Sequence, residues 1–206
     1  SQVSLPHTWG TVKLPKIVDQ LGNIEMSGIY HGLISDFTAM CNLRTKAGNI
    51  IVNANLSKND TNGEYMYQAS LSSPKFSVNK LLPNNWITST GFDLIIDGEG
   101  FDLETMRAEI VSGLLFDTRI RQKNIQNIEI TGAIEEKAIE TNIIIDDSII
   151  GITLYGGINM QDEVNTYMAN ANIKHINLSE LDIWKTQLDT NITIGTTINA
   201  NIHGNN

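Results

Sequence analysis

The sequence predicts an all-β fold, a long curved antiparallel sheet with one or two short helices. Isoleucine is frequent among its 206 residues, with valine and threonine in support, and these branched side chains fit a pleated surface. Apolar and polar residues alternate with a period of two along most of the chain. Each predicted strand has one apolar face and one polar face. This favours antiparallel pairing, because parallel strands usually have continuous apolar sequences.

Four segments show the alternation most clearly. Apolar residues or glycine occupy nearly every second position in 50–56, 65–71, 128–134 and 192–202, mostly with polar residues between them. We expect a short helix at 14–23 and single helical turns within 77–83 and 178–184. Turn-forming residues predict turns at Ser57–Glu64, Leu82–Trp86, Asp97–Gly100, Arg121–Asn124 and Gly132–Ala138.

Two segments about one hundred residues apart suggest an internal repeat. The segment YMYQASLSSPKFSVNKLL begins at Tyr65, and YMANANIKHINLSELDI begins at Tyr167. Their apolar residues match in order, and each segment is followed by a strand that ends in glycine. The sequence therefore predicts one repeat-built segment over 1–206, with approximate units 21–100 and 125–206.

Composition argues against several classes of function. Acidic residues outnumber basic ones 23 to 14, and the net charge is −9, so we expect no nucleic-acid partner. Cys41 is the single cysteine, which excludes an internal disulfide and is expected to be a buried structural thiol. The four histidines lack the short spacings of zinc sites, so neither a metal nor a cofactor is expected.

The ends of the chain predict a piece of a longer protein. No apolar run is long enough to span a membrane, and SQVSLPHTWG lacks the regions of a signal peptide. Any export signal or anchor is expected to lie outside this sequence.

Three pairs of acids are candidates for chemistry, namely Asp97 with Glu99, Glu135 with Glu136, and Asp146 with Asp147. Catalytic acid pairs converge from distant strands, and adjacent residues in a strand point to opposite faces, so we do not expect these neighbouring acids to form a dyad. Nucleophile, phosphate-binding and calcium-loop motifs are absent from the sequence. We expect no enzymatic activity, and we predict that Asp146 and Asp147 form the polar tip of a hairpin.

The order of several glycine-containing elements resembles one family. LGNIEMSGIYHGLISDFTAMCNLRTKAGNIIVNANL is followed by the segment from Tyr65, then LIIDGEGFDLETM, then a hairpin over 127–160. In the first element, the characteristic positions are held by Gly28, Gly32, Phe37, Leu43, Thr45 and Gly48. Over roughly 21–183 this order resembles the TamB-like proteins of the AsmA/TamB group, in the form common in Bacteroidetes.

The resemblance implies an internal segment of a protein that is anchored in the inner membrane and spans the periplasm of a diderm bacterium. Its sheet would form a half-open apolar groove that carries phospholipid acyl chains between the inner and outer membranes. The family is also linked to outer-membrane protein assembly with a BamA-like barrel partner. This sequence departs from the family's full pattern, because it contains neither the N-terminal anchor nor the C-terminal end.

Isoleucine and leucine residues at dry positions are the candidate lining of such a groove. Plain core packing explains the same pattern about equally well at any one position. The candidates are Ile130, Ile143, Ile145, Ile150, Ile152, Leu154, Ile192, Ile194 and Ile198.

A second interpretation is a protein-binding module in which a strand edge pairs with an incoming strand. The same edges predict possible self-association of the chain.

Overall fold

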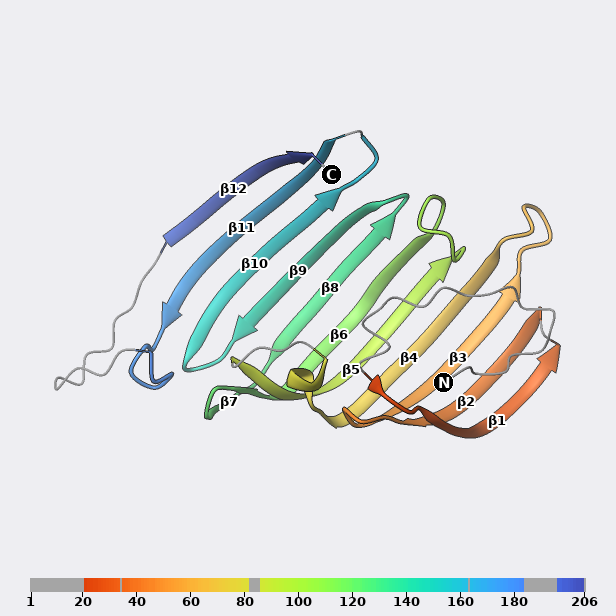
Figure 1. Cartoon of the computed structure of the whole chain (residues 1–206), viewed down its shortest axis with the longest axis horizontal. Helices are drawn as coiled ribbons and strands as arrows, with labels where there is room; N and C mark the ends of the chain where they lie inside the picture. Colours follow the sequence, from red (N-terminus) through yellow and green to blue (C-terminus); the bar gives the residue numbers. More distant parts are fainter. Residues whose placement is uncertain (1–20, 34, 82–85, 163, 184–195, 206) are drawn as a thin grey trace.

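The computed structural model describes residues 21–33, 35–81, 86–162, 164–183 and 196–205. They form one layer of strands that lie side by side in an open sheet (Figure 1). A three-residue 3-10 helix, η2 (Val78–Lys80), follows the fourth strand. The strands are β1 (Glu25–Leu33), β2 (Asp36–Arg44), β3 (Asn49–Lys58), β4 (Tyr65–Phe76), β5 (Ile87–Glu99), β6 (Arg107–Ile120), β7 (Lys123–Ile125), β8 (Ile128–Glu135), β9 (Ala138–Asp146), β10 (Ile150–Asn159), β11 (Val164–Ile176) and β12 (Thr196–Asn205).

Every strand pairs antiparallel with its neighbours in the sequence, except at β7. The order across the sheet is β1-β2-β3-β4-β5-β6-β8-β9-β10-β11-β12, and β7 folds back onto the end of β6. The predicted all-β antiparallel fold is confirmed. The sheet remains open, with β1 and β12 as its two edge strands.

The turn predictions have mixed outcomes. The turn in 57–64 is confirmed between β3 and β4. The turn predicted at Asp97–Gly100 begins later than predicted. Asp97 to Glu99 stay paired with both neighbouring strands, and the chain leaves β5 at Gly100, where φ is +74°. The turn in 132–138 is shorter than predicted. It consists of Glu136 and Lys137, which both have positive φ, as a two-residue hairpin requires.

The helical expectations are met at one place. The single turn predicted within 77–83 is confirmed by η2. Described residues 178–183 form hydrogen-bonded turns instead of a helix. The segments 14–20 and 82–85 lie outside the described residues. The division into two repeat units stays a prediction, in which Tyr65 and Tyr167 would hold equivalent places in β4 and β11.

Three rows of residues cross the strands on the face that the alternation predicted to be dry, which we call the apolar face. The residues of a row lie opposite one another on neighbouring strands. The first row is Phe37, Leu56, Tyr67, Gly98, Ala108, Ile134, Ile139, Ile158 and Tyr167. The middle row is Ala39, Ala54, Ala69, Ile96, Ile110, Gly132, Thr141, Gly156 and Ala169. The third row is Cys41, Val52, Leu71, Leu94, Gly113, Ile130, Ile143, Leu154 and Ala171.

A bulge in β6 keeps these rows continuous. Ile96 lies opposite Ile110, whereas the preceding Ile95 lies opposite Ser112, so β6 contains one extra residue at Val111. An extra residue shifts the alternation by one position. Ile110 and Gly113 therefore both lie on the apolar face, although their spacing of three would place them on opposite faces of a regular strand.

A compact core forms at one end of the apolar face. Ile125, Ile128, Ile150 and Leu181 are buried together there. Ile125 belongs to β7 and Leu181 to the turns after β11, and both segments lie at the same end of the sheet (Figure 1). They cover the ends of β8, β9 and β10, where Ile143 of the third row packs against this core. The first and middle rows contribute no residue to it.

Candidate functional site

The apolar face is a broad surface on which three rows of mostly apolar residues cross the described strands. Few large apolar side chains are fully buried, and most side chains of the three rows are half-buried by their neighbours in the sheet. The chain has an accessible surface of 14055 Å². A compact protein of its mass, 22.8 kDa, is expected to expose roughly 9,600 Å². The excess agrees with a sheet whose faces are not covered by a second layer of described residues.

The middle row forms a shallow depression in the apolar face. Between β9 and β11 a hollow of about 270 Å³ lies over this row, and Thr141, Gly156 and Ala169 contribute to it. Leu154 and Ala171 of the third row line one side of the hollow. A Cβ added to Gly156 would meet its nearest atom at 3.7 Å, an ordinary contact distance, so this position has room for a Cβ without a clash.

A pair of aromatic rings lies where the first row crosses β4 and β5. The Tyr67 ring lies over Gly98, where an added Cβ would come within 2.3 Å of the ring. The same ring stacks on Phe101, with centroids 5.0 Å apart and an interplanar angle of 8°. Glycine is therefore required at position 98 for the ring to lie flat across the strand.

The predicted lining residues fall into three groups. Ile150 is buried in the core, and Ile143, Ile145 and Ile152 pack against it. Ile130 and Leu154 occupy the third row and are not among the side chains packed against that core. Ile198 lies opposite Ala171 in the β11–β12 register, and Ile192 and Ile194 lie outside the described residues. Of the described candidates, Ile130 and Leu154 best fit an open lining.

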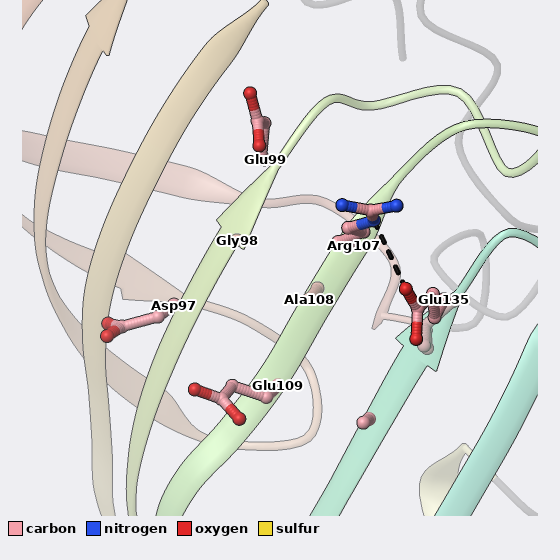
Figure 2. Close-up of a pocket in the computed structure, with 9 residues that line it drawn as sticks. Asp97, Gly98, Glu99, Arg107, Ala108, Glu109 and Glu135 are labelled. Carbon is pink, nitrogen blue, oxygen red and sulfur yellow. Dashed lines mark ion pairs between the residues drawn. The ribbon is translucent and has the colours of Figure 1, made fainter.

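The opposite face carries a group of acidic residues whose proximity the sequence did not predict. Asp97 lies opposite Glu109, and Glu99 lies opposite Arg107, around a hollow of about 310 Å³ (Figure 2). Arg107 forms ion pairs with Glu135 and Glu136, at 3.3 and 3.2 Å. Alternation alone places Asp97 and Glu99 on one face, but their neighbours on β6 and β8 follow only from the register.

These acids do not form an enclosed site. The hollow is broad, and Arg107, Glu109 and Glu135 around it are exposed, while Asp97 and Glu99 are half-buried. Oδ1 of Asp97 is buried and has no hydrogen-bond partner among the described residues. Within the described part of the chain, no three histidine, cysteine or acidic side chains are grouped so that they could hold a metal ion. The arrangement gives no reason to assign chemistry to this face.

The paired aspartates form the predicted hairpin tip. Asp146 ends β9, and Asp147 lies in the turn before β10. The Asp147 carboxylate accepts hydrogen bonds from the backbone N–H groups of Ile149 at 2.8 Å and Gln126 at 3.0 Å. Its carbonyl oxygen lies 2.9 Å from Nε2 of His175. These contacts tie the tip to β7 and β11, so the predicted structural role of the pair is confirmed.

Among the described residues, three side chains have a shifted pKa. Burial raises the pKa of the Cys41 thiol and that of the Tyr67 phenol, and both residues belong to the apolar face. On the opposite face, a hydrogen bond to Glu140 is the main cause that raises the pKa of Tyr155, with desolvation and the charge of Glu140 adding to it. The Cys41 thiol is therefore mostly protonated at neutral pH and is a weak nucleophile.

Within the ranges that the structure describes, no helix has the length and hydrophobicity needed to cross a bilayer. The chain matches no protein-family model, no curated protein and no solved structure. The resemblance to TamB-like proteins thus stays a prediction.

Proposed function

We propose that the apolar face binds the acyl chains of lipids. The observation that supports this function best is the continuity of its three rows, which cross the sheet with no covering layer among the described residues. Large side chains of the first and third rows flank the small residues of the middle row for much of its length, and an extended acyl chain fits such a depression. The activity requires no catalytic group.

The energetics favour weak and mobile binding. Burial of a methylene group contributes about 0.8 kcal/mol, so a chain that buries one side on an open face gains roughly half of that per methylene. Neighbouring strands present similar apolar surfaces, so an acyl chain can move from one to the next without leaving the face. Headgroups would remain in water, and we expect little selectivity among them.

The resemblance to TamB-like proteins extends this proposal to a cellular setting. In that setting the sheet would be a section of a groove that conducts phospholipid between the inner and outer membranes. The described sheet is open, so it would have to curl to form that groove in the full-length protein, where a BamA-like barrel would be its partner. Binding of acyl chains to the face can be tested independently of this setting.

Cys41 provides a native probe of occupancy. It belongs to the third row, opposite Val52, so a bound fatty acid should cover its thiol and slow its reaction with a maleimide several-fold. The reaction is followed by intact mass spectrometry at a moderately alkaline pH, because the raised pKa of this thiol limits the thiolate at lower pH.

A matched probe lies on the next residue. In the double variant Cys41→Ser, Asn42→Cys, the thiol is on the opposite face of β2, where Asn42 is exposed. Fatty acid should leave its labelling rate unchanged. Equal protection of both thiols, or protection of neither at saturating fatty acid, would contradict the proposal.

A further inference from the structure

In the part of the chain that the structure describes, edge strand β1 lacks the features that normally prevent a sheet edge from pairing. It has nine residues, all exposed, and it contains neither lysine nor proline. Its pairing with β2 is continuous, without a bulge. Natural sheets usually protect their edges with lysine or proline, with bulges or with short strands. A long unprotected edge therefore indicates a surface that is made to pair.

Apolar side chains are exposed on both faces of this edge. Met26 and Tyr30, 67% and 50% exposed, lie on the side of the apolar face, opposite Leu43 and Ala39. Ile29 and Leu33, 62% and 73% exposed, lie on the other side. Each of these side chains has a cross-strand neighbour only on β2, and an added strand would give it a second one on its outer side.

The number of strands distinguishes between two ways of joining two copies. Eleven strands follow one another antiparallel across the sheet, so β1 and β12 run in the same direction. A head-to-tail contact between β12 of one copy and β1 of the next, with strands and faces aligned, would be parallel. Two β1 strands related by a twofold axis perpendicular to the sheet are antiparallel, which is the pairing used throughout this sheet and the slightly more stable one.

The distribution of charge permits the twofold contact. Glu25 is the only acidic residue in β1, and Arg44 pairs with it at 3.4 Å. The dense acids begin at β5, four strand spacings from the edge, or roughly 19 Å. That distance exceeds the Debye length of about 8 Å at physiological ionic strength, so repulsion between two chains of charge −9 is largely screened at the edge.

We propose that two copies of this chain pair through their β1 edges about a twofold axis, which joins their apolar faces into one surface of double width. The contact is about nine residues long and consists of backbone hydrogen bonds with apolar cross-strand pairs. The lipid function does not depend on it, and the dimer does not require bound lipid.

Sedimentation velocity and amide hydrogen exchange on the purified chain test this pairing. Wild-type protein should shift from monomer to dimer with concentration, and β1 amides should become protected over the same range. Ile29→Lys should weaken dimerisation by roughly tenfold or more, because lysine at an edge opposes strand addition. Ile51→Lys is the matched control on interior strand β3, where a 45% exposed isoleucine lies on the same face, and it should dimerise like wild type.

Three results would overturn the proposal. One is a wild-type chain that stays monomeric across the concentration range. Another is a dimer whose β1 amides exchange as fast as those of the monomer, as a contact between apolar faces would give. The third is β1 protection by an added extended peptide at concentrations where the chain alone remains monomeric, which would assign the edge to a foreign strand. The hydrogen-exchange measurement needs only wild-type protein, so it tests the β1 pairing even where a variant fails to fold.

Discussion

Replacing Leu154 with aspartate is expected to weaken acyl-chain binding strongly while leaving the sheet folded. Leu154 lies in the third row between Ile143 and Ala171 and lines the hollow over the middle row. It does not pack against the buried core, unlike Ile152, whose replacement would also disturb folding. A carboxylate at this position must keep its water, and that cost opposes an apolar chain beside it.

The effect is measured by titrating the protein with a fluorescent fatty acid. Affinity should fall by roughly tenfold or more, which corresponds to about 1.4 kcal/mol. Thr153→Asp is the matched control, because Thr153 is the preceding residue of β10 and points to the opposite face. It adds the same charge and should bind like wild type. If both variants lose affinity equally, net charge is the cause and the apolar face is not the site.

Replacing Ile125 with alanine is expected to cause the largest loss of stability. Ile125 is fully buried, with 0% exposure, in the core that joins β7 to the turn containing Leu181. Truncation of a buried isoleucine leaves a cavity and costs about 2–5 kcal/mol. Small domains have only about 5–15 kcal/mol of stability in total, so this substitution removes a large share of it.

Urea denaturation measures the loss as a lower midpoint. Ile51→Ala is the matched control, because Ile51 is 45% exposed on β3 and its truncation opens no cavity. We expect the control to change the free energy of unfolding by less than about 1 kcal/mol. Equal destabilisation by both substitutions would show that the covered end of the sheet does not stabilise it more than the open face does.

The sequence was sufficient to predict which residues share a face. Alternation over 50–56 and 128–134 placed Val52 and Ile130 on the apolar face, because side chains in a strand alternate with a strict period of two. It failed wherever the backbone departs from that period. The bulge at Val111 has no distinctive residue that would reveal it, yet it decides which β6 side chains face the rows.

Contacts between distant segments could not be predicted from the sequence, for a different reason. Ile125 and Leu181 are separated by 56 positions and meet only because β7 and the turns after β11 fold over the same strand ends. Likewise, the group around Asp97 and Glu109 depends on the register between β5 and β6. A single sequence specifies local alternation but does not state the register, so predicted lining residues such as Ile150 could not be distinguished from core residues.

Photo-crosslinking with a diazirine-bearing fatty acid tests most directly whether the apolar face is the lipid-binding surface. The label inserts into whatever it touches, and peptide mass spectrometry then assigns each adduct to a residue. Adducts are expected on row residues such as Leu71, Leu94 and Leu154, and not on their neighbours Ser70, Ile95 and Tyr155 on the opposite face. Adducts shared equally between the two faces, or confined to the opposite face, would contradict the account.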